Sequence, residues 1–147
     1  MNLLSEAVKI STAVTPTDGV AGTTDIEGTI LDMSGFDGVL MLVRMGTITA
    51  TAVTSIKAQS GTDDTMSDAA DLEGTSQSIA ADDDDETFYI DLRAPKERYV
   101  RLYVDRGTAN AVVASAEYIQ YKAHVLVTSH GTGVSGEAHV TPDEGTA

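Results

Sequence analysis

Acidic side chains gather in two loops, and clustered carboxylates could hold a hard cation such as calcium. The clusters lie in residues 60–74 and 82–86, and together they contain ten of the 23 Asp and Glu residues. Their spacing does not fit an EF-hand loop, which needs Asp-x-Asp-x-Asp-Gly and a Glu at the twelfth position. We therefore expect solvated loop tips without a bound metal or cofactor, and a calcium-dependent hydrolase is the weaker alternative.

Other catalytic chemistries lack the residues they require. The chain has no cysteine and no Gly-x-Ser-x-Gly motif, so neither a thiol nor a nucleophile elbow is present. No pair of carboxylates is singled out on a strand for glycoside hydrolysis. The three histidines, His124, His130 and His139, lie in a glycine-rich segment that gives no basis for a shared metal site. The residues predict a protein that is not an enzyme.

Positive charge is concentrated in one part of the chain. Five of the nine basic residues are candidates for docking on an acidic partner: Arg93, Lys96, Arg98, Arg101 and Arg106. The basic turn 93–98 and the acidic run 82–86 flank a predicted six-residue strand, which separates them by about 20 Å. We expect an electrically polar molecule whose basic end docks while its acidic end faces solvent. The alternative is scattered surface charge with local salt bridges.

Two tyrosines share one face of a predicted strand. Tyr99 and Tyr103 alternate with apolar residues, and we interpret them as a candidate subunit interface. Exposed aromatic rings also form sugar-binding platforms, although such platforms commonly use Trp, which this chain lacks. A carbohydrate-binding module is therefore the runner-up to an interface.

The overall charge argues against a protein that binds nucleic acid directly. Nine basic against 23 acidic residues give a formal charge of −14, which disfavours direct binding to nucleic acid. The first residues show neither the basic nor the apolar region of a signal peptide, and no apolar run approaches a membrane span. We expect a protein made in the cytoplasm and used there or in a particle assembled there.

Hydrophobic alternation and turn residues predict an all-β fold. Eight short strands point to a β-sandwich, with a jelly roll as the natural choice. They are expected at 5–15, 24–32, 39–45, 51–59, 77–80, 87–92, 99–105 and 111–121. In the first strand Val8, Ile10, Thr12 and Val14 are predicted to share one face, and in the second Ile30 should point inward.

The most apolar run, residues 39–43, should be a central strand buried on both faces or nearly so. We assign residues 1–127 to one sandwich domain. Residues 128–147 are rich in glycine and form an extended arm. Composition favours a frayed terminus there, whereas a functional arm would become ordered on a neighbouring subunit.

Several segments resemble one family. They are Gly-Phe-Asp-Gly-Val-Leu-Met-Leu-Val at 35–43, Ser-Ile-Lys-Ala-Gln at 55–59, Arg-Tyr-Val-Arg-Leu at 98–102, Thr-Ala-Asn-Ala-Val at 108–112, Ile-Gln-Tyr at 119–121, and the ending 139–147. In these segments the chain is similar to the decoration, or cement, proteins of tailed-bacteriophage capsids. The similarity lies in the pattern of strands and turns across most of residues 30–147.

The resemblance implies a jelly-roll-like β-sandwich that associates as a homodimer or homotrimer. It implies a structural virion protein on the outer surface of the capsid, assembled in the host cytoplasm, that clamps neighbouring major capsid subunits. Nucleic acid and membrane are not expected partners. The alternative is a carbohydrate- or receptor-binding module of the virion, in a tail or head fibre.

Overall fold

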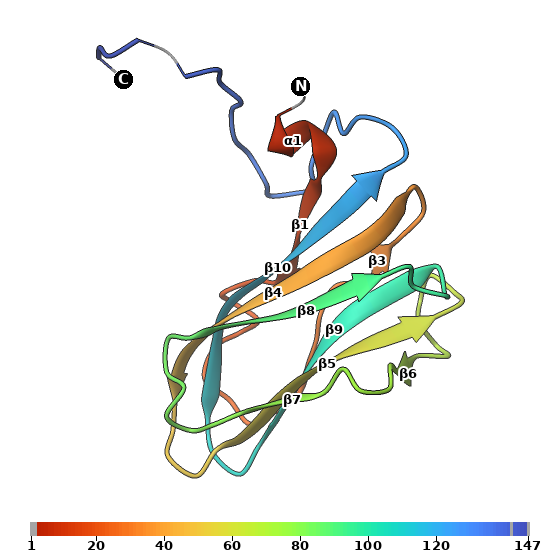
Figure 1. Ribbon diagram of the computed structural model, residues 1–147. Helices are drawn as coiled ribbons and strands as arrows, with labels where there is room; N and C mark the ends of the chain where they lie inside the picture. The colour runs from red at the N-terminus through yellow and green to blue at the C-terminus, as the bar shows by residue number, and fades with distance from the viewer. Residues whose placement is uncertain (1–2, 142, 147) are drawn as a thin grey trace.

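Two antiparallel sheets packed face to face form the protein, as the computed structural model shows (Figure 1). It describes residues 3–141 and 143–146, so positions 1, 2, 142 and 147 of the predicted domain and arm lie outside the described residues. The elements in chain order are α1 (Leu4–Ala7), β1 (Lys9–Val14), β2 (Ile26–Glu27), β3 (Leu31–Asp32), β4 (Phe36–Ile48), β5 (Val53–Gly61), β6 (Ala70–Asp71), β7 (Gln77–Ile79), β8 (Thr87–Arg93), β9 (Tyr99–Gly107) and β10 (Ala111–Ala123).

The strand order confirms the all-β sandwich and is that of a jelly roll. Sheet A has the order β1-β10-β4-β8. Sheet B has the order β2-β9-β5-β6, with β3 also pairing with β9 and β7 with β5. If β2 with β3 and β6 with β7 each count as one interrupted strand, the eight strands of two Greek keys are present. Successive strands therefore lie in opposite sheets, except that β5 and the interrupted strand β6–β7 are both in sheet B.

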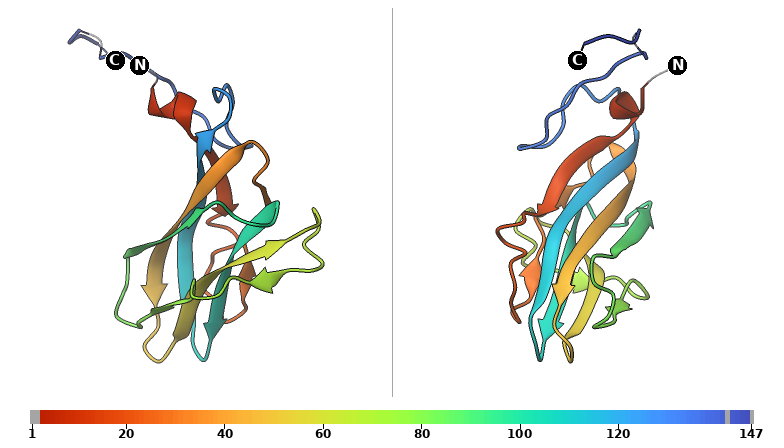
Figure 2. Two further views of the ribbon diagram at one scale, coloured as in Figure 1. Left: turned by 45° about the vertical axis from the view of Figure 1, so that its right-hand side comes forward. Right: turned by 90° about the vertical axis from the view of Figure 1, so that its left-hand side faces the viewer.

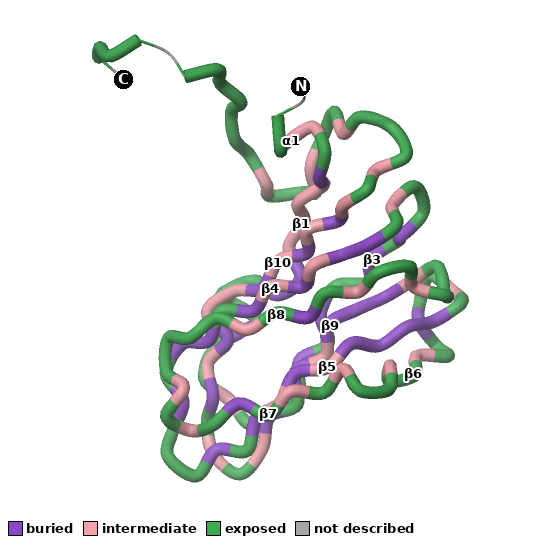
Figure 3. The backbone as a smooth tube through the Cα atoms, in the orientation of Figure 1, coloured by how far each residue is buried: buried purple, intermediate pink, exposed green. Residues whose placement is uncertain are grey.

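One face of each central strand forms the core between the sheets (Figure 3). In β4, Val39, Met41 and Val43 have no exposed surface, because alternate side chains of a strand point to the same face. The intervening Leu40 and Leu42 are only partly buried. The strand, predicted to be buried on both faces or nearly so, is therefore fully buried on its inner face and only partly on its outer face, because residues 3–141 and 143–146 form no further layer over the outer face of sheet A (Figure 2).

Two other predictions near the N-terminus are corrected. The helical turn α1 occupies residues that were expected to begin the first strand. The register of β1 shifts between Thr12 and Val14, so Ala13 and Val14 are both buried while Ile10 and Thr12 are only partly so. A bulge of this kind breaks the strict alternation on which the prediction depended.

The predicted second strand is interrupted. Ile26 pairs with Val104 and Leu31 with Val100, and both point inward. Between them Gly28 donates its N–H to the Leu102 carbonyl over 2.8 Å, and the alternation changes phase. Ile30, predicted to point inward, is 39% exposed for this reason.

A buried tyrosine joins the two sheets. The hydroxyl of Tyr118 on β10 accepts a hydrogen bond from the Leu102 N–H on β9 and donates one to the Thr29 carbonyl, each over 2.8 Å. Burial holds the pKa of this hydroxyl well above its ordinary value, so it stays protonated and can donate. Sheet A is thus fixed to sheet B by directional bonds as well as by apolar packing.

Both termini leave the sandwich at the same end (Figure 2). The chain after β10 turns back past α1 and β1, and residues 132–141 and 143–146 then run away from the body (Figure 1). No helix in the described part of the chain is long and apolar enough to cross a membrane.

Candidate functional site

The first acidic loop uses its carboxylates to hold its own backbone. Asp63 accepts hydrogen bonds from the Thr65 N–H and hydroxyl, over 2.8 and 2.6 Å, and from the Ser67 hydroxyl. Asp68 accepts them from the N–H and hydroxyl of Thr62, over 2.9 and 2.6 Å. The bonds from Ser67 and Thr65 hold the pKa of Asp63 far below its ordinary value. These carboxylates stabilise the loop, as Asx-turn residues do.

The second acidic loop makes similar contacts. Asp83 accepts a hydrogen bond from the Ala80 N–H over 2.8 Å, and Asp84 accepts one from the Ile48 N–H over 2.6 Å. Across residues 3–141 and 143–146, no group of three His, Asp or Glu side chains is placed to hold a metal ion.

The three histidines lie apart in separate contacts. His124 lies 2.8 Å from Asp37, and His139 lies 2.9 Å from Glu137. His130 accepts a hydrogen bond at Nδ1 from the Ile10 N–H over 3.1 Å. That bond fixes the chain after β10 against β1.

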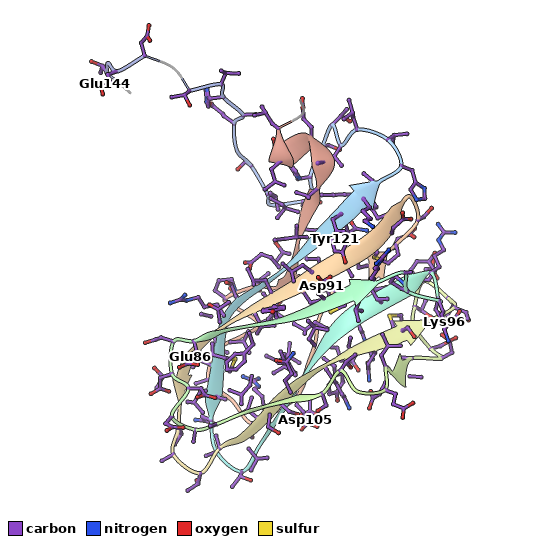
Figure 4. All side chains as sticks on the ribbon, viewed as in Figure 1. Glu86, Asp91, Lys96, Asp105, Tyr121 and Glu144 are labelled. Carbon is purple, nitrogen blue, oxygen red and sulfur yellow. The ribbon has the colours of Figure 1, made fainter. Side chains whose placement is uncertain are left out.

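The acidic run 82–86 and the basic turn 93–98 do lie at opposite ends of β8, as Glu86 and Lys96 show (Figure 4). The first acidic loop, however, follows β5 at the basic end, where Gly61 pairs with Tyr99. Asp64 of that loop lies near enough to Arg98 to favour its charged form. The expected separation into one acidic and one basic end is therefore incomplete, because sheet pairing brings acidic residues to both ends.

Two of the five predicted docking residues are buried by partners of their own chain. Arg106 donates to the carbonyls of Thr24, Val20 and Ala111 over 2.7, 2.8 and 2.7 Å, and burial lowers the pKa of its guanidinium. Arg101 donates to both carboxylate oxygens of Glu27, over 2.9 and 3.1 Å. Both arginines are buried. They serve the fold and are removed from the candidate docking surface.

The other three basic residues, Arg93, Lys96 and Arg98, are exposed at one end of the sandwich. Arg98 forms a bidentate pair with Asp32, over 3.0 and 2.8 Å, and this pair lowers the pKa of the Asp32 carboxyl. The pair fixes the turn to β3. Beside it lies a shallow hollow of about 440 Å³ whose lining includes Met33, Phe36, Pro95, Lys96, Glu97 and Arg98.

The two candidate interface tyrosines contact cations of their own chain. The Lys57 ammonium lies 4.7 Å from the centre of the Tyr103 ring, and the Arg98 guanidinium lies 5.3 Å from that of Tyr99. The Tyr103 hydroxyl donates to Asp25 over 2.9 Å, and this bond raises its pKa. Each ring therefore already has an intramolecular cation–π partner.

The chain after β10 carries features that the sequence did not single out. Val127 N–H donates to the Glu6 carbonyl over 2.9 Å, and Gly131 N–H donates to the Ile10 carbonyl over 2.8 Å. Residues 127–131 are thus held along α1 and the free edge of β1. Leu4, Val125 and Leu126 are exposed nearby. In the sequence this contact was signalled only by a glycine at position 131, whose hydrogen-bond partner Ile10 lies far earlier in the chain.

Comparisons of this chain with protein-family models, with curated proteins and with solved structures find no match.

Proposed function

We propose that this chain is a structural virion protein that binds the outside of a tailed-phage capsid and clamps neighbouring major capsid subunits. The observation that carries the proposal is the end of the sandwich around the turn 93–98. It presents exposed cations beside a shallow, partly apolar hollow, in a chain with a formal charge of −14. This combination suits an acidic patch on a partner protein, since opposite charges steer association and apolar contacts hold it.

The interior of the molecule suits a clamp. Val39, Leu102 and Tyr118 are fully buried between sheets that cross-link through the Tyr118 hydroxyl. A close-packed sandwich deforms little, so a force applied at one end is transmitted to the other. The acidic run 82–86 lies at the end of β8 opposite the basic turn, and its Asp83 and Asp84 accept hydrogen bonds from backbone N–H groups of the same chain. In the proposed orientation this run faces solvent on the outer side of the particle.

The docking residues within the proposal are Arg93 and Lys96, with Arg98 as a positioning residue. Arg98 already pairs with Asp32, so its charge is partly compensated within the chain. Arg93 and Lys96 are exposed and are the cations that a partner carboxylate would contact. Exposed ion pairs contribute mainly to association rate and specificity.

The experiment is co-sedimentation of the purified protein with heads of the parent phage that lack it. We expect the wild-type chain to bind, and the double change Arg93→Glu and Lys96→Glu to reduce binding at least about tenfold, because several charge contacts reverse. A matched control is Glu86→Lys with Asp82→Lys, which changes as many charges at the opposite end and should bind as the wild type does. Equal binding by both double variants would refute the docking site. Failure of the wild-type protein to bind heads would refute the function.

The carbohydrate-binding alternative gains little support. Sugar platforms need open aromatic faces, and the rings of Tyr99 and Tyr103 each lie near a cation of the same chain.

A further inference from the structure

The outer faces of the two sheets differ in chemistry. On sheet B, Lys57, Gln59 and Arg101 form ion pairs and hydrogen bonds with Asp71 and Glu27, as expected for a face in water. On sheet A, the cross-strand register instead aligns apolar residues. Two adjacent rows cross its strands, Ile10-Ile119-Leu40-Asp91 and Thr12-Glu117-Leu42-Tyr89.

These rows contain side chains that the core does not cover. Leu40, Leu42 and Ile119 alternate with fully buried residues of β4 and β10, so they point away from the core and are only partly buried. Tyr89, at the edge of the patch on β8, is 62% exposed. Asp91, labelled on β8 in Figure 4, marks this face. In the apolar run 39–43 of β4, two of the five side chains, Leu40 and Leu42, thus point outward.

We propose that this outer face of sheet A, centred on Leu40, Leu42 and Tyr89, is the surface through which two copies of the chain associate. Contiguous apolar side chains on an antiparallel sheet, bordered by polar ones, are typical of an interface. A tyrosine at its edge adds a large ring that loses little conformational freedom on binding.

The charges on this face favour a second copy as the partner. Its charged members are Arg44, Arg93, Asp91 and Glu117, two of each sign, whereas the whole chain carries −14. A two-fold interface brings the same patch of both subunits together, so the patch must be complementary to itself. A face with balanced charge meets this condition. A surface with the average charge of this molecule would repel its own copy.

This proposal assigns the subunit interface to the outer face of sheet A and no longer to Tyr99 and Tyr103. Those tyrosines lie on the outer face of sheet B and contact Arg98 and Lys57 of their own chain. Tyr89 lies on the outer face of the opposite sheet, where it is 62% exposed and its cross-strand neighbour is Leu42.

The experiment measures the mass of the purified protein in solution by light scattering during gel filtration, across micromolar to millimolar concentrations. We expect twice the chain mass of 15.4 kDa for the wild type. Tyr89→Asp should halve that mass, because it places a charge in the apolar patch without touching the core. Leu42→Glu should do the same. The control is Val53→Asp, which changes another exposed apolar residue, 65% exposed on β5 of sheet B, and should leave the mass at two chains.

The outcomes separate the possibilities. A wild-type protein with the mass of one chain throughout would refute the proposal, as would a dimer that persists in both Tyr89→Asp and Leu42→Glu. If Leu42→Glu fails to fold, Tyr89→Asp decides, since its side chain is already largely in water. A monomeric wild type whose binding to heads is lost in Tyr89→Asp would overturn self-association and assign the face to the capsid. The mass measurement uses the chain alone, so the test of self-association does not depend on the proposed capsid role.

Discussion

Gly131 lies against Ser11 with no room for a side chain, since a Cβ at position 131 would stand 2.6 Å from the Ser11 Cβ. The close approach allows Gly131 N–H to reach the Ile10 carbonyl and Ile10 N–H to reach His130 Nδ1. β1 is an edge strand of sheet A, and edge strands present unpaired backbone groups. The beginning of the C-terminal arm therefore covers part of an edge of its own sandwich. Composition alone had favoured a frayed terminus there.

The first prediction concerns this contact. Gly131→Val should detach residues 128–131 from β1, because the added side chain collides with Ser11. Amide hydrogen exchange at Ile10 should rise about tenfold, which corresponds to the loss of roughly 1.4 kcal/mol of local hydrogen bonding.

The matched control is Gly136→Val in the same arm. A Cβ at 136 meets no atom within 4 Å, so exchange at Ile10 should stay as in the wild type. If the two variants exchange alike at Ile10, residues 128–131 do not cover β1 in solution.

The second prediction separates structural arginines from docking cations. Arg106→Met should lower the free energy of unfolding by on the order of 3 kcal/mol, because one buried and two partly buried carbonyl groups lose the guanidinium that donates hydrogen bonds to them. Urea denaturation measures this loss. Lys96→Met removes the same charge from an exposed side chain and should change stability by less than about 0.5 kcal/mol. Comparable losses in the two variants would show that Arg106 does not serve the fold.

Much of the fold could be predicted from the sequence, because a strand with one buried face shows an alternation of apolar and polar residues within a few positions. The period-two pattern of Val100, Leu102 and Val104 placed β9 correctly, and all three have no exposed surface. The eight predicted strands correspond to the eight strands of the jelly roll. The interruption at Gly28 was missed because it depends on a hydrogen bond to Leu102, which local alternation does not encode.

The candidate site was less predictable, because the burial of a charged residue depends on distant partners. Arg101 resembles Arg98 in the sequence, yet Arg101 is buried by Gln59 and Glu27, which lie 42 and 74 residues earlier. The outward position of Leu40 and Leu42 was missed for a related reason. An apolar run indicates burial, but it does not say whether the second layer over the strand belongs to the same chain.

The last prediction concerns acid. Hydrogen bonds from the Arg106 N–H and the Tyr103 hydroxyl lower the pKa of Asp25, and the Arg98 pair lowers that of Asp32. A carboxyl with a lowered pKa in the folded state contributes stability that is complete above its unfolded pKa, about 3.9, and that is lost as the pH falls through the folded value. The free energy of unfolding should therefore fall steeply below about pH 4.

Asp25→Asn should lower stability at neutral pH and make this acid decline shallower. Asp143→Asn in the exposed arm should leave the whole profile unchanged. Urea denaturation from neutral pH to pH 2 tests this, and parallel profiles for the wild type and Asp25→Asn would contradict it.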